Sequence, residues 1–165
     1  MDGSHTPAPF RDARYAPRRL DVERLADGGV VLTNPTPWSD RFLTTTAPLG
    51  HWAAARARFE AAAAARPGFA MARSSAALAA YQLGDLAAAE QQFRSLIRRY
   101  PLFADARAGL TALLWQRGAR GEAESHWAAA SGLDPRYRQP EWLLQIRRWP
   151  PQPVQALQQF LALTS

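Results

Sequence analysis

The chain has 165 residues, which suits a single domain. It contains no cysteine, so disulfides, thiolate metal sites and a cysteine nucleophile are excluded, and a reducing compartment fits the composition. All 20 basic residues are arginine, against 14 acidic residues; the net charge of +6 comes from residues 51–165, where 14 arginines face eight acidic residues. This excess can attract acidic protein surfaces, nucleic acid or anionic lipid, and a solvated face in an arginine-rich protein also explains it.

The N-terminal part has a different composition from the rest. Residues 1–49 hold six of the 13 prolines, and residues 1–19 show no hydrophobic periodicity, which predicts an extended arm. The polar N-terminus lacks the apolar core of a secretory signal, and no run of about 18 apolar residues could form a transmembrane helix. We therefore expect a cytoplasmic protein.

A β-hairpin is predicted over residues 20–34. The segments LDVERL and VVLTN read as strands, and Asp27-Gly28-Gly29 between them suits a tight turn with positive φ angles. An isolated hairpin is only marginally stable in water, so this one should pack on the helices or on a partner. Residues 36–49 follow, and Pro37, Pro48 and a run of three threonines argue against a full regular helix there.

From residue 50 onward, four types of residue recur every 34 positions. They are Gly50, Gly84 and Gly118; Ala55, Ala89 and Ala123; Phe59, Phe93 and Trp127; and Pro67, Pro101 and Pro135. An alanine followed four positions later by an aromatic residue, with a proline eight further on, resembles the signature of the tetratricopeptide repeat (TPR) family. The resemblance implies an all-α solenoid of stacked helical hairpins.

The spacing predicts helices over residues 51–66, 70–83, 85–100, 104–117 and 121–132. Gly84 and Gly118 let the chain turn between antiparallel helices, and Asp85 can cap the helix that follows it. After Pro135 the repeat fades, but residues 141–148 look helical and residues 154–163 are amphipathic. We therefore predict three parts: an arm with a hairpin over 1–49, TPR-like repeats over 50–135, and capping helices over 136–165 that cover the last apolar face.

A partner-binding groove is predicted from the TPR resemblance, because the first helix of each hairpin lines the concave face of such arrays. The corresponding residues are Met71, Arg73, Ser74, Leu78, Tyr81, Arg107, Ala108, Ala112 and Trp115, with Asp105 beside them. The polar residues with which some TPR domains hold a C-terminal carboxylate are absent, so the groove suits a helix or an extended apolar segment. Tyr81 and Trp115 share one repeat position and are either packing residues or partner anchors.

Nothing in the sequence indicates catalysis. No phosphate-binding glycine loop, zinc-protease motif or nucleophile elbow is present, and we expect no enzyme, no cofactor and no metal site. His5, His51 and His126 are scattered, and the last two are expected to be exposed helix residues rather than metal ligands.

Residues 67–165 also resemble a narrower family of small TPR proteins from cyanobacteria and chloroplasts. The resemblance is carried by residues 100–103 (YPLF), Trp115, residues 120–127 (RGEAESHW), 134–137 (DPRY) and 147–151 (RRWPP). It implies an oxygenic phototroph and a place near thylakoid membranes.

Three functions follow as hypotheses. The first is a non-catalytic scaffold, either a subunit or an assembly factor of a photosynthetic membrane complex such as a photosystem or its antenna, with peripheral contact to anionic membrane. The second is a general protein-interaction adaptor unrelated to photosynthesis. The third is an RNA-binding helical repeat, against which the small and apolar groove positions argue.

Overall fold

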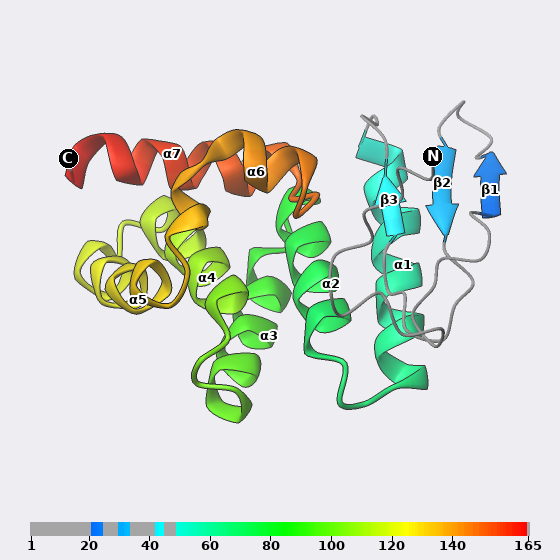
Figure 1. Cartoon of the computed structure of the whole chain (residues 1–165), viewed down its shortest axis with the longest axis horizontal. Coiled ribbons are helices and arrows are strands. Elements are labelled where there is room, and N and C mark those ends of the chain that lie inside the picture. The colour runs from blue at the N-terminus through cyan, green and yellow to red at the C-terminus, as the bar shows by residue number, and fades with distance from the viewer. Residues whose placement is uncertain (1–20, 25–29, 34–41, 45–48, 165) are drawn as a thin grey trace, which may run out of the picture.

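The repeat region forms five antiparallel helices in a stacked array. The computed structural model describes the backbone of residues 21–24, 30–33, 42–44 and 49–164, and the side chains of residues 51–164. The array consists of α1 (Leu49–Ala65), α2 (Ala70–Gln82), α3 (Leu86–Arg99), α4 (Ala104–Gln116) and α5 (Arg120–Leu133). These bounds agree with the predicted helices to within two residues, and the helices lie side by side in Figure 1. The prediction of a TPR-type helical solenoid is confirmed.

The recurring residues have the roles that their chemistry predicts. Gly84 and Gly118 adopt φ angles of +84° and +81°, a region that side chains disfavour. The N–H of Gly84 donates to the Tyr81 carbonyl at 2.9 Å and closes α2, while a side-chain oxygen of Asp85 accepts from the Ala88 N–H at 3.2 Å and caps α3. Local hydrogen bonds therefore specify the turn at Gly84, and the turn at Gly118 has the same backbone bond, to the Trp115 carbonyl, without a side-chain cap.

The small and aromatic repeat residues form the core between neighbouring helices of the array. Ala55, Ala89 and Ala123 are fully buried, and Phe93 is buried beside the small residue Gly109 of α4. A Cβ on Gly109 would lie 2.6 Å from the Phe93 ring, so α3 and α4 approach closely only because that position has no side chain.

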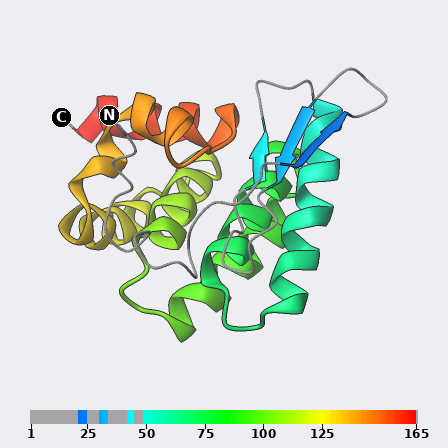
Figure 2. The same cartoon turned by 45° about the vertical axis from the view of Figure 1, so that its right-hand side comes forward.

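Three short strands lie at the α1 end of the array. They are β1 (Asp21–Arg24), β2 (Val30–Thr33) and β3 (Phe42–Thr44), in an antiparallel sheet of order β1-β2-β3 with Val22 opposite Leu32 and Leu32 opposite Leu43. The third strand falls where we predicted only that a regular helix would be absent, and it contacts α1 (Figures 1 and 2). The predicted arm over 1–19 and the Asp27-Gly28-Gly29 turn lie outside the described residues.

The C-terminal part crosses the array instead of extending it. A 3₁₀ turn, η2 (Pro135–Arg138), leads into the short helix α6 (Pro140–Gln145) and then α7 (Pro151–Thr164). We predicted a helix over 141–148 and a later start for the last one; α6 ends earlier, and α7 begins at Pro151, whose ring suits the first turn of a helix. Figure 1 shows α6 and α7 running along one side of the array.

Candidate partner-binding surface

The predicted groove residues do lie together on α2 and α4, but most of them are not open to a partner. Ser74, Leu78, Tyr81, Ala108 and Ala112 are all buried, with exposed fractions between 0% and 2%. The other members, Met71, Arg73, Arg107 and Trp115, are half-buried. These residues therefore lie in a covered groove, and their role in partner binding stays a prediction.

Helix α7 covers this groove. It packs on α4 and also contacts α2, so it lies over the groove of these two helices instead of stacking beyond α5 as a cap on the last repeat would. The Gln152 N–H donates to Gln82 Oε1 at 2.8 Å. The Phe160 ring packs edge to face on Trp115 and Trp127, with ring centroids 5.9 and 6.2 Å apart. Trp115 is thus a packing residue, and the occupant of the groove is the chain's own last helix.

A buried carboxylate fastens the C-terminal segment to the groove. Asp105 is fully buried in the first turn of α4. One of its oxygens, Oδ1, accepts from Arg147 Nη2 at 2.6 Å, Arg147 Nε at 3.0 Å, the Tyr137 hydroxyl at 2.8 Å and Trp149 Nε1 at 3.1 Å; the other, Oδ2, accepts from the Ser74 hydroxyl at 2.5 Å. We call Asp105, Ser74, Tyr137, Arg147 and Trp149 the aspartate cluster.

The aspartate cluster keeps its central carboxylate ionised. Burial alone raises the pKa of Asp105, but the charge of Arg147 and the hydrogen bonds from Ser74, Arg147 and Tyr137 outweigh it, so the pKa lies below its ordinary value. Burial in turn raises the pKa of the Tyr137 hydroxyl, with the neighbouring Asp105 charge acting in the same direction. The cluster is therefore an ion pair with its hydrogen bonds satisfied, which is the chemistry of a structural clasp rather than of a proton-transfer site.

Tyr81 also has a structural role. Its hydroxyl donates to Gln116 Oε1 at 2.5 Å and lies 3.2 Å from the Ala112 carbonyl oxygen, so it links α2 to α4 inside the core. Of the two open interpretations of Tyr81, packing is the one that the structure supports.

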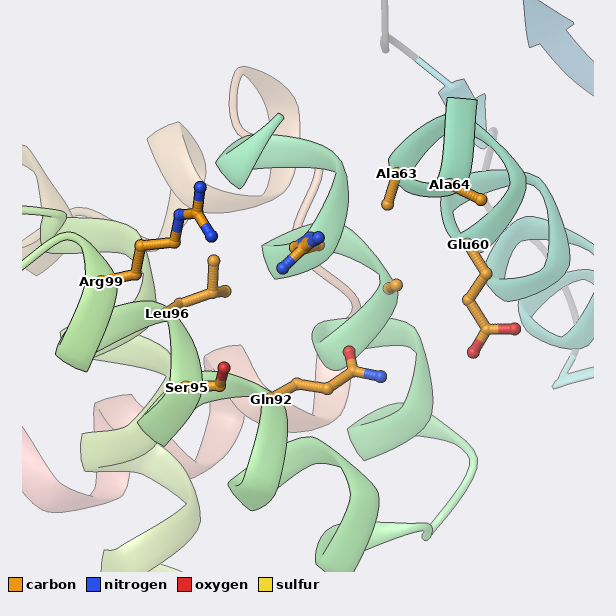
Figure 3. Close-up of a pocket in the computed structure, with 9 residues that line it drawn as sticks. Glu60, Ala63, Ala64, Gln92, Ser95, Leu96 and Arg99 are labelled. Atoms are coloured by element: carbon orange, nitrogen blue, oxygen red, sulfur yellow. The ribbon is translucent and has the colours of Figure 1, made fainter. Parts of the chain in front are cut away.

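A pocket of about 280 Å³ lies open between α1, α2 and α3 (Figure 3). Helix α1 contributes Glu60, Ala63 and Ala64, and helix α2 contributes Arg73 and Ala76. The opposite wall comes from α3, with Gln92, Ser95, Leu96 and Arg99. Only Arg73 of these nine was among the predicted site residues. We call this cavity the α1–α3 pocket.

The lining of the α1–α3 pocket has a net positive charge, with Arg73 and Arg99 against the single carboxylate of Glu60. Arg73 and Arg99 form no ion pair within residues 51–164, whereas Glu60 is already paired with Arg56 at 2.8 Å. The Gln92 amide oxygen is buried and has no hydrogen-bond partner among the described side chains. A ligand that supplies negative charge and an N–H donor would complement these groups.

The remaining predictions concern the histidines, a metal site and a membrane-spanning helix. His51 is buried at 2% exposure and His126 is half-buried, so the expectation that both are exposed is wrong. Burial lowers the pKa of His126, as does the charge of Arg107, while the Glu122 charge raises it. The described residues contain no group of three side chains suited to holding a metal, and none of the described helices is long and apolar enough to cross a membrane.

Comparison with known proteins agrees with the repeat architecture. The family model for the tetratricopeptide repeat matches residues 49–102 and 75–138, which together span more than half of the chain. No curated protein matches the sequence at a significant level. With its 34-residue period, stacked helical hairpins and family match, the chain belongs to the tetratricopeptide repeat family.

Proposed function

We propose that the protein is a non-catalytic TPR scaffold that binds another protein. The observation that carries the proposal is a TPR array over residues 49–138 that leaves a charged pocket open on the face formed by α1, α2 and α3. TPR arrays work by presenting a surface made of several stacked repeats, and a pocket to which three helices contribute is such a surface.

The face formed by α1, α2 and α3 is the first candidate for the partner-binding site. The concave groove of α2 and α4 is occupied by α7 and fastened by the aspartate cluster, so a partner there would have to displace a packed helix. The α1–α3 pocket needs no such displacement. The predicted groove residues therefore stay a second candidate site, which a partner could reach only by displacing α7.

The setting of this scaffold is a narrower proposal. We infer a subunit or assembly factor of a photosynthetic membrane complex, a photosystem or its antenna, held at the membrane by protein contacts and by the arginine excess. The support is the resemblance of residues 67–165 to small cyanobacterial and chloroplast TPR proteins, through such segments as 134–137 and 147–151. The alternative is a general adaptor with no link to photosynthesis.

Affinity purification from detergent-solubilised cells, at low and at high salt, tests both the scaffold function and the photosynthetic setting. A protein that co-purifies in stoichiometric amount supports the scaffold, and photosystem or antenna subunits among the captured proteins support the photosynthetic setting. Capture of RNA with a steep salt dependence, and of no protein, would contradict the scaffold and favour the RNA-binding hypothesis. Capture of a protein partner without any photosynthetic subunit would contradict the setting alone.

A further inference from the structure

The α1–α3 pocket is open because two positions in it, Ala63 and Ala76, are small. One repeat further along the chain, Ala63 corresponds to Ile97 and Ala76 corresponds to Leu110. Leu110 is fully buried and Ile97 packs against the main core, so larger side chains occupy the equivalent space between α3, α4 and α5. The cavity therefore follows from the small side chains of this repeat.

The charged groups around the pocket favour an anionic ligand. Arg73 comes from α2 and Arg99 from the last turn of α3, and neither has an ion pair within residues 51–164. The lining also holds one carboxylate, Glu60, which pairs with Arg56, so two arginines against one acidic group leave the lining with a net charge of +1. A guanidinium group binds carboxylates through two parallel hydrogen bonds, so two unpaired arginines at one cavity suit a carboxylate ligand.

The Gln92 side chain adds a requirement for a hydrogen-bond donor. Its Oε1 atom is buried on the α3 wall of the pocket without a partner among the described residues (Figure 3). Buried acceptors in folded proteins are nearly always paired, so this unpaired oxygen in the wall of a cavity can accept from a ligand once the Gln92 side chain turns toward it. A backbone N–H of a bound peptide is such a donor.

An apolar depression adjoins the pocket and shares Arg99 with it. This second hollow, of about 410 Å³, is lined by Ala70 and by residues 99–103. Leu102 in its wall is 78% exposed, the most exposed of the large hydrophobic residues that the structure describes. Arg99 thus stands between a charged pocket and an apolar surface, an arrangement that suits a ligand with neighbouring acidic and apolar side chains.

We propose that the α1–α3 pocket binds an acidic peptide segment of a partner protein. A carboxylate of the segment lies between Arg73 and Arg99, a backbone N–H donates to Gln92 Oε1, and a neighbouring apolar side chain covers the depression at Leu102. This inference rests on the proposed scaffold function and gives the chemistry of the partner. A pocket of 280 Å³ takes one or two side chains, which agrees with a peptide rather than with a cofactor.

Binding of two labelled peptides tests the proposal directly. The first is a fluorescein-labelled hexapeptide that alternates glutamate and leucine, and the second has glutamine in place of each glutamate. Fluorescence anisotropy at low salt should show binding of the first peptide and at least about tenfold weaker binding of the second, because a hydrogen bond to a charged group contributes more than one to a neutral group.

Three variants locate the binding. Arg99→Gln should weaken binding of the glutamate peptide about tenfold, and Ala63→Ile, which copies the next repeat, should do so by filling the cavity. Arg98→Gln is the matched control, because Arg98 is the exposed neighbour of Arg99, does not line the pocket and carries the same charge. Arg98→Gln should change the affinity for the glutamate peptide by no more than about twofold, as expected for an exposed surface charge. Circular dichroism checks that each variant is folded.

Several outcomes would overturn the proposal. They are failure of the wild-type protein to bind the glutamate peptide, equal binding of both peptides, and an equal loss in Arg98→Gln and Arg99→Gln. Displacement of the peptide by a uridine oligonucleotide at the same Arg99-dependent site would reassign the pocket to RNA. If Arg99→Gln retains a co-purified protein partner as well as wild type does, the pocket assignment fails while the scaffold function stands.

Discussion

Arg147 binds Asp105 across 42 positions of sequence, with Nη2 and Oδ1 2.6 Å apart and the carboxylate fully buried. The contact joins the segment between α6 and α7 to the first turn of α4. The same guanidinium lies 2.7 Å from the Met71 sulfur of α2, so one side chain ties the tail to both helices of the groove. The buried ion pair and the hydrogen bonds around it therefore fasten the segment that precedes α7 to the groove.

Replacing Asp105 should be among the most destabilising substitutions in the chain. Asp105→Asn leaves Arg147 buried without its counter-ion, and breaking a buried pair costs about 3–5 kcal/mol. Urea denaturation followed by circular dichroism measures the change in the free energy of unfolding. The matched control is Glu124→Gln, which removes an exposed partner of Arg120 and should cost less than about 1 kcal/mol. Similar losses in the two variants would contradict the clasp role of the aspartate cluster.

The same ion pair predicts an acid-dependent loss of stability. The pKa of Asp105 is lower in the folded protein than in the unfolded chain, where it is about 3.9. Its contribution is therefore fully present above about pH 4 and is lost as the pH falls through the folded-state pKa. Unfolding free energies measured over this acidic range should converge for wild type and Asp105→Asn. A difference between them that stays constant as the pH falls would show that Asp105 is not ionised in the native state.

Phe160 should hold α7 in the groove. Its ring is fully buried against Trp115 and Trp127, so Phe160→Ala removes both edge contacts and leaves a cavity, at a cost of about 3–5 kcal/mol. Hydrogen exchange read by mass spectrometry should show that Phe160→Ala speeds exchange in α7 relative to wild type, and does so more in α7 than in α3. Leu163→Ala, at a position 61% exposed, is the control and should leave the exchange of α7 nearly unchanged. Unchanged protection of α7 in Phe160→Ala would rule out this packing.

Two helical glycines should respond oppositely to alanine. Gly109→Ala places a Cβ 2.6 Å from the buried ring of Phe93, and such overpacking costs about 1–3 kcal/mol. A Cβ added at Gly132 of α5 would have no neighbour within 4 Å. Gly132→Ala should therefore stabilise the protein by up to about 1 kcal/mol, because alanine has a higher helix propensity than glycine. Thermal denaturation of the two variants gives the sign of each change. A stabilised Gly109→Ala variant would mean that α3 and α4 can move apart.

The repeat fold could be predicted because its determinants are local and recur. Gly84 and Gly118 act within one hairpin, and the buried alanine and aromatic residues recur at the same position of each repeat, so their spacing of 34 residues is visible without knowledge of the tertiary structure. The strand β3 escaped prediction because it depends on pairing with β2 and on contact with α1, and its segment FLT carries only a short apolar signal.

The candidate site was harder to predict because it depends on contacts between distant segments. The sequence indicated that residues 154–163 form an amphipathic helix but not that this helix lies on α4 instead of beyond α5. Asp105 was noted only as a groove position, since nothing local links it to Arg147. The α1–α3 pocket could have been found by aligning the repeats, because Ala63 and Ala76 are small where Ile97 and Leu110 are large.

Site-specific photo-crosslinking measures most directly whether this TPR protein binds a protein partner through its open face. A benzoylphenylalanine placed at Ser95, in the wall of the α1–α3 pocket, is compared with one at Gln155, an exposed position of α7. The account predicts a crosslinked partner from Ser95 and not from Gln155, and mass spectrometry of the crosslinked segment should show Asp or Glu beside apolar residues. A partner captured only from Gln155, or crosslinks to RNA in place of protein, would contradict it.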